Sequence, residues 1–167
     1  YRVAVAESSG LDDASVDIVT VAQALHWFDH DAFYREVERV MRPDGVFVAW
    51  AYALATVSTE VDAVVGELSS GILDGCWPAR RRYIDEAYAT VPFPFDEIAT
   101  PELEMSVMWS ADQVIAYIST WSAVDRYRRD RGACPIELVR DRLRSAWGED
   151  ARRVRWPLHL RMGHLPR

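Results

Sequence analysis

Half of the 167 residues are hydrophobic, which is enough for one domain with a buried core. The formal net charge of −7 argues against nucleic acid or an anionic membrane surface as a partner, and no apolar run approaches the ~20 residues needed to cross a bilayer. The two cysteines, Cys76 and Cys134, lack the spacing of a metal site, so we expect no metal and a reducing, cytoplasmic compartment.

The first element in chain order is a short apolar run. Tyr1 to Val5 is interpreted as the remnant of a strand, and Ala6 and Glu7 follow it at a strand-to-loop position. The polar residues from Ser8 to Ser15 then predict a loop.

The next run, residues 17–22, is β-branched and has no helical spacing. This pattern is typical of a strand buried on both faces in a parallel sheet. The loop from Ala22 to Phe28, with the sequence AQALHWF, follows the carboxyl end of that strand, where ligands bind in such sheets. The loop is therefore the first candidate site.

A helix and a second strand follow the loop. Asp29 is predicted to cap a helix whose apolar face is formed by Phe33, Val37, Val40 and Met41. Residues 42–45, Arg-Pro-Asp-Gly, should end it, because Pro cannot continue a helix and Gly permits a tight reversal. Residues 46–52 carry no charge, which again predicts a strand covered on both faces. Together these elements form a βαβ unit.

The remaining chain predicts three helices and two strands. Helices are expected from a capping box at Thr59, from a second capping box at Ser110, and from Pro135 to an end at Gly148. Residues 102–109 and 154–162 alternate between apolar and polar, so they should be strands that pair. Arginines of the second strand would then lie opposite Glu102 and Glu104.

The run VDIVTVAQALHWFD, followed by FYREVERVMRPDGVFVAWAY, resembles the second half of the class I S-adenosylmethionine-dependent methyltransferases. Within that class it is similar to the type 11 group related to trans-aconitate methyltransferase, and the resemblance continues through PFPFDEI, TWSAVDRY and WPLHLRMG. It implies an α/β, Rossmann-like fold with strand order 3-2-1-4-5-7-6 and an antiparallel last strand. The chain would supply strands three to seven, with Val3–Val5 as strand three.

The same resemblance implies that residues 1–167 are the carboxyl-terminal part of one methyltransferase domain, with helical insertions near 57–100 and 110–150. The glycine-rich cofactor turn after strand one and the acidic residue that ends strand two are both absent. We therefore expect the chain alone to bind the cofactor weakly or not at all, and to be weak or inactive. The alternative is a non-catalytic half domain that acts as a scaffold or partner subunit.

The cofactor implied by the resemblance is S-adenosylmethionine. Ala6 and Glu7 would lie beside the adenine, and the loop would contact the methionine half. Trp27 either places its ring near the sulfonium, a cation–π contact, or packs the loop onto the sheet. The cofactor contacts expected from this resemblance are Ala6, Glu7, Ala22, Gln23, Ala24 and Trp27.

The methyl acceptor is expected to be a small molecule, with a carboxylate as one candidate. Trp27, Tyr52 and Trp121 are the expected acceptor contacts. His26 could act as general base, shape the pocket or simply pack. The arginines at 80–82 could bind an acceptor carboxylate or form a solvated helix end.

Strand pairing also predicts an association site. Without strands one and two, the strand at 17–22 has an open edge, and an apolar edge strand tends to pair with another chain. We expect a homodimer through this edge, a direct pairing of Val3–Val5 with it, or aggregation.

Overall fold

The computed structural model describes residues 3–166 and divides into two compact units. The first unit contains the chain up to Ala53, then Arg80–Leu103 and the residues from Pro157 onward. The second unit contains Leu54–Ala79 and Glu104–Trp156. The predicted insertion near 57–100 is thus divided between the two units.

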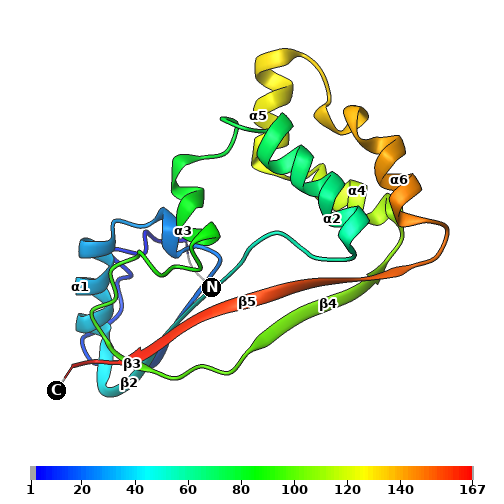
Figure 1. Ribbon diagram of the computed structural model, residues 1–167. Helices are drawn as coiled ribbons and strands as arrows, with labels where there is room; N and C mark the ends of the chain where they lie inside the picture. The colour runs from blue at the N-terminus through cyan, green and yellow to red at the C-terminus, as the bar shows by residue number, and fades with distance from the viewer. Residues whose placement is uncertain (1–2, 167) are drawn as a thin grey trace. The chain divides into compact units, whose positions relative to one another are not determined.

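One sheet organises the strands (Figure 1). Its order is β1-β2-β5-β3, and β4 also pairs with β5. β1 and β2 are parallel, whereas β5 is antiparallel to both β2 and β3. This is the expected order of strands four, five, seven and six, with the last strand antiparallel. The bounds are β1 Val16–Ala22, β2 Met41–Tyr52, β3 Asp96–Ile98, β4 Leu103–Trp109 and β5 Arg152–His164.

The expected strand three is not formed. Residues 3–5 have no strand geometry and Val3 and Val5 are exposed, while Tyr1 and Arg2, which belong to the same predicted run, lie outside the described residues. A strand needs a neighbour to satisfy its backbone groups, and β1 pairs only with β2 in the described sheet. The predicted direct pairing of Val3–Val5 with β1 is therefore wrong for this structure.

The βαβ unit forms, but Met41, predicted on the apolar face of the helix, and residues 42–45, predicted as the turn after it, belong to β2. Helix α1, His30–Val40, begins at Asp29, whose Oδ1 accepts from the backbone N–H of Ala32 at 3.0 Å. The Arg-Pro-Asp-Gly segment lies inside β2, where four residues bulge opposite Asp17 of β1. A Cβ on Gly45 would lie 2.9 Å from the Arg42 carbonyl oxygen, so glycine is required there by close approach.

Burial of the strands differs from the prediction. In β1 only Val21 is buried, and Ile18 is 61% exposed. In β2 one face, with Phe47, Ala49 and Ala51, is fully buried, while the other face is half-buried. A charge-free run was expected to be covered on both faces, but β1 has one neighbouring strand and the described elements cover one face more completely than the other.

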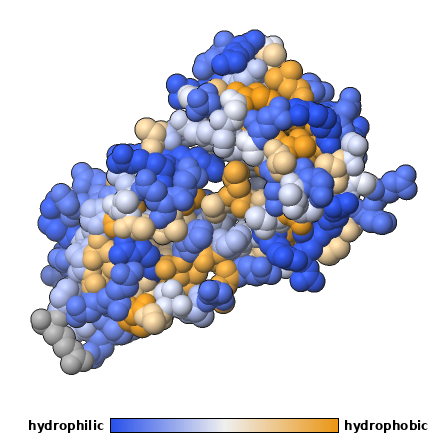
Figure 2. All heavy atoms as spheres, viewed as in Figure 1, coloured by the Kyte–Doolittle hydropathy of each residue, from blue (hydrophilic) through white to orange (hydrophobic). Residues whose placement is uncertain are grey.

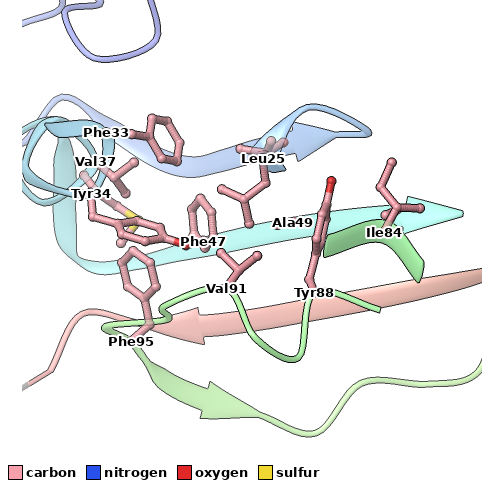
Figure 3. Close-up of a cluster of buried hydrophobic side chains, with 13 residues drawn as sticks. Leu25, Phe33, Tyr34, Val37, Phe47, Ala49, Ile84, Tyr88, Val91 and Phe95 are labelled. Atoms are coloured by element: carbon pink, nitrogen blue, oxygen red, sulfur yellow. The ribbon is translucent and has the colours of Figure 1, made fainter. Parts of the chain in front are cut away.

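Aromatic packing forms the core of the first unit (Figure 3). The Phe47 ring stacks on Phe95 at 4.6 Å between centroids, and the Tyr34 ring meets both rings edge-on. The connection after the short helices η3 Ala79–Arg81 and α3 Arg82–Asp85 contributes Tyr88 and Val91 to this core. Arg161 of β5 pairs with Glu97 at 2.9 Å, so the expected partners Glu102 and Glu104 were wrong for this arginine.

The second unit is mainly helical. Its capping box at Ser110 and Gln113 and its helix end at Gly148 are confirmed, whereas the cap of the first helix is Ser58, one residue before the expected Thr59. The helix that begins after Ser110 ends at Ile118, and a separate helix begins at Ser122. The elements are α2 Thr59–Gly66, η2 Glu67–Ile72, α4 Ala111–Ile118, α5 Ser122–Arg131, η4 Pro135–Leu138 and α6 Arg140–Trp147.

Hydrophilic side chains cover most of the face shown in Figure 2, and hydrophobic ones reach it in small groups. Within residues 3–166, no helix is both long and apolar enough to cross a membrane.

Candidate functional site

The candidate site is the loop from Ala22 to Phe28, at the carboxyl end of β1. Gln23 has a left-handed backbone with φ +52, which turns the chain sharply out of the strand. A short 3₁₀ helix, η1 Leu25–Trp27, follows directly. Leu25 and His26 point inward and are buried, whereas Trp27 is 54% exposed.

Gln23 joins the loop to the end of β2. Its Nε2 donates to the Tyr52 carbonyl at 3.1 Å, and its Oε1 accepts from the Tyr52 N–H at 2.9 Å. The Gln23 backbone N–H donates to the Trp50 carbonyl at 2.9 Å. The carboxamide thus replaces a further strand residue, and it holds the carboxyl ends of both parallel strands together.

Arg80 holds the loop from a distant part of the chain. Its Nη1 donates to the Trp27 carbonyl at 2.5 Å and lies 3.3 Å from the Phe28 carbonyl oxygen. Arg81 pairs with Asp85 at 3.3 Å, and Arg82 lies over the Tyr83 ring at 5.0 Å. Arg80 is exposed in the last turn of η3, in agreement with the predicted solvated helix end, and its contacts with the loop carbonyls are an additional role that was not predicted.

The side chain of His26, within the loop, points inward and is only 3% exposed. Its Nδ1 is 3.0 Å from the Tyr88 hydroxyl. Burial lowers the pKa of His26, and the charges of Arg80 and Arg81 lower it further. Burial raises the pKa of Tyr88 to about 12, so both side chains are neutral at pH 7.

The amino-terminal segment reaches the other end of the loop. Glu7 Oε1 accepts from the Asp29 N–H at 3.0 Å, and Ala6 packs against the core of the first unit. Ser9 is anchored to α1, where its N–H and hydroxyl both donate to Glu36 Oε1. Hydrogen bonds from Arg39 and Ser9 lower the pKa of Glu36 to about 2.

The structure brings most of the predicted site residues together in the first unit. Glu7 contacts the end of the loop, Gln23 contacts Tyr52, and Ala24 packs against the core. Ala22 is exposed at the end of β1. Trp121 lies in the second unit, where its ring packs on Trp77 at 5.4 Å between centroids.

Sequence reasoning missed the roles of Arg80 and Tyr88. Arg80 is one of three successive arginines, and nothing in that run distinguishes it from its neighbours. Ala87 and Tyr88 both have left-handed backbone, which places the Tyr88 side chain in the core. Neither alanine nor tyrosine favours this conformation, so the sequence did not predict the turn.

Comparisons with known proteins address the class to which this fold and loop belong. A family model described as a methyltransferase domain matches residues 1–49. The whole chain is similar to a solved structure from Anaeromyxobacter dehalogenans, provisionally described as a type II methyltransferase, with 47% identity and a TM-score of 0.91. That alignment covers 100% of this chain and 72% of the other.

Two curated relatives carry methyltransferase names. A provisionally named methyltransferase from Dictyostelium discoideum is 36% identical over 150 residues, which cover 88% of this chain and 57% of the relative. An uncharacterized methyltransferase from Mycobacterium bovis is 58% identical over 40 residues, covering 24% of this chain and 16% of the relative. The chain thus spans little more than half the length of the Dictyostelium relative.

The sheet order, the parallel βαβ unit and the loop at the strand ends define a Rossmann-like α/β protein with the methyltransferase fold. The similarity to the Anaeromyxobacter structure extends over the full chain and most of that protein. The chain belongs to the class I S-adenosylmethionine-dependent methyltransferases.

Proposed function

We propose that the protein transfers a methyl group from S-adenosylmethionine to a small-molecule acceptor. The observation that carries this proposal is the loop Ala22–Phe28, which lies at the carboxyl end of a parallel strand and is held by Gln23, Arg80 and Tyr88. A loop fixed from three sides is preorganised for a ligand, so little ordering has to occur on binding.

The loop fits the methionine half of the cofactor. The exposed Trp27 ring is the side chain suited to a sulfonium, and backbone groups at Ala22 and Gln23 supply polar contacts. The Gln23 carboxamide binds Tyr52 and its N–H donates to Trp50, so the contribution of Gln23 would come from its backbone carbonyl. Ala6 and Glu7 remain the proposed adenine contacts. The bound cofactor supplies an electrophilic methyl group.

The protein's own task is then positioning and exclusion of water. Trp27 and Tyr52, both in the first unit, are the proposed acceptor contacts, and a carboxylate is the proposed acceptor group. A carboxylate is ionised at pH 7 and needs no base. Among the described residues, no cluster of His, Cys, Asp and Glu could hold a metal ion, and the proposed chemistry requires none.

The proposed compartment is the cytoplasm. Cys76 and Cys134 are both free thiols, which agrees with a reducing environment. The net charge of −7 supports small molecules rather than nucleic acid or an anionic membrane as partners.

Replacing Trp27 by Ala tests the proposed role of its ring. A cation–π contact is worth about 0.5–2 kcal/mol, so we expect Kd for S-adenosylmethionine to rise by roughly 2- to 30-fold. Binding of S-adenosylhomocysteine, which lacks the positive sulfur, should weaken less. Calorimetry with both ligands measures the difference.

Trp27→Phe is the conservative partner and should restore part of the preference for the charged ligand. Trp109→Ala, in the second unit, removes an indole of the same size and should leave both affinities unchanged. Equal losses for the charged and the neutral ligand in Trp27→Ala would argue against a sulfonium contact.

We also propose that β1 pairs with β1 of a second copy. β1 has one neighbour in the described sheet, and Ile18 is 61% exposed on it. We expect the purified chain to dimerise at micromolar concentration and Ile18→Lys to shift it toward monomer, as measured by light scattering after size exclusion. Leu138→Lys, at another exposed apolar residue, should have no effect. A monomer at all concentrations would disprove this pairing.

A further inference from the structure

Tyr88 occupies a strained turn. Ala87 and Tyr88 both have left-handed backbone, with φ +53 and +60, a conformation that non-glycine residues rarely adopt. The Tyr88 N–H donates to the Tyr83 carbonyl at 2.7 Å, which closes the turn after α3. Tyr88 is nevertheless fully buried. Strain at a buried aromatic residue indicates that the surrounding structure holds the side chain where it is.

Arg161 of strand β5 also holds the backbone of this turn. Arg161 of β5 donates through Nη1 to the Tyr88 carbonyl at 3.1 Å and to the Val91 carbonyl at 2.8 Å. The same guanidinium pairs with Glu97. The backbone of the turn is therefore fastened to the sheet, and the Tyr88 side chain points to the loop that carries the proposed site.

Within the described residues, His26 Nδ1 forms a hydrogen bond with the Tyr88 hydroxyl at 3.0 Å. Either group can donate in such a pair. Burial raises the pKa of Tyr88, whereas the backbone N–H groups of His26 and Leu25, which face its oxygen as donors, act to lower that pKa. Because these backbone donors use the lone pairs of the Tyr88 oxygen, its O–H is left to donate to His26 Nδ1.

The charges around His26 favour the neutral ring. Arg80 and Arg81 both oppose its protonation, and the Tyr88 hydroxyl contributes no negative charge at pH 7. A neutral imidazole that accepts at Nδ1 must carry its proton on Nε2.

We propose that Tyr88 is a positioning residue, whose hydroxyl donates to His26 Nδ1 and fixes His26 as the neutral Nε2–H tautomer. Nδ1 then accepts from the Tyr88 hydroxyl and Nε2 carries a proton, so His26 supports the loop from beneath instead of acting as a general base. Within the proposed methyl transfer, on which this consequence rests, the acceptor atom must bring its own available lone pair. A carboxylate, a thiolate or a free amine attacks without first losing a proton to a base, whereas a neutral alcohol has a lone pair but needs a base to take its proton.

The tautomer can be measured without cofactor or substrate. Two-bond ¹H–¹⁵N correlations report the protonation of each imidazole nitrogen, and His26→Gln identifies the His26 signals among the four histidines. In the wild-type chain we expect a protonated Nε2 and a bare Nδ1 at neutral pH. In Tyr88→Phe the Nδ1 partner is lost, and we expect the His26 signals to move toward a mixture of tautomers.

Tyr34→Phe is the matched control. Tyr34 is also a buried tyrosine of the same core, and its hydroxyl donates to the Pro92 carbonyl at 2.6 Å, away from His26. It should leave the His26 signals unchanged. A proton on Nδ1 in the wild-type chain would overturn the proposal, as would identical His26 signals in wild type and Tyr88→Phe.

Activity provides a separate readout. If His26 were the base, His26→Gln should reduce kcat by about 10²- to 10⁴-fold. The positioning role predicts less than about a tenfold loss and no new pH dependence near the His pKa. A loss above about 100-fold in a folded variant would overturn the proposal. Absence of methyl transfer in the wild type would leave the tautomer result intact, because the tautomer is measured without cofactor or acceptor.

Discussion

Replacing Gln23 by Ala is expected to destabilise the first unit by about 1–3 kcal/mol and to disorder the loop. The substitution removes two hydrogen bonds to Tyr52, each worth about 0.5–1.5 kcal/mol, and leaves the Tyr52 N–H and carbonyl without these partners. Urea unfolding measures the stability, and amide exchange at residues 24–28 measures the order of the loop.

Two further substitutions at the same position separate the causes. Gln23→Gly also removes both bonds but relieves the left-handed backbone, so it should be less destabilising than Gln23→Ala. Gln23→Glu retains the acceptor for the Tyr52 N–H but loses the donor to its carbonyl, and should give an intermediate result. If Gln23→Ala unfolds like the wild type with a protected loop, the carboxamide does not hold the strand ends together.

Replacing Phe47 by Ala is expected to cost about 3–5 kcal/mol, the largest single effect in the first unit. Phe47 is fully buried, stacks on Phe95, and meets the rings of Tyr34 and Phe33 at larger angles. Truncation would leave a cavity between α1 and the turn before β3, and such a loss is a large share of the ~5–15 kcal/mol that stabilises a typical domain. Urea unfolding, followed by the amides of β2, measures it.

Phe93→Ala is the matched control in the same cluster. Phe93 is only half-buried, and its ring faces the Arg161 guanidinium at 4.1 Å. Its truncation should cost clearly less than that of Phe47. Equal costs would mean that the packing around Phe47 is not the main source of stability in this unit.

The βαβ unit could be predicted because its signals are local. The Asp29 cap and the apolar spacing of α1 lie within one helix, and the ends of β1 were recognised from its β-branched run to within one residue. The strand order came from the family resemblance. Burial could not be predicted in this way, because it depends on neighbours that a single strand does not encode, as Ile18 shows.

The position of the loop could be predicted, but the contacts that hold it could not. Gln23 and Tyr52 are 29 positions apart, and His26 and Tyr88 are 62 apart. No local pattern indicates that Arg80, one of three successive arginines, would donate hydrogen bonds to the carbonyls of the loop. The left-handed backbone at Tyr88 is imposed by the surrounding packing, so it could not be predicted from the residue type.

The central claim is that the loop Ala22–Phe28 receives the cofactor. The most direct measurement is an amide NMR titration of the chain with S-adenosylhomocysteine, which locates even millimolar binding. We predict shifts concentrated at Ala6, Glu7 and residues 22–28, with Trp27 among the largest. Shifts confined to the second unit, or none at millimolar ligand, would contradict the account.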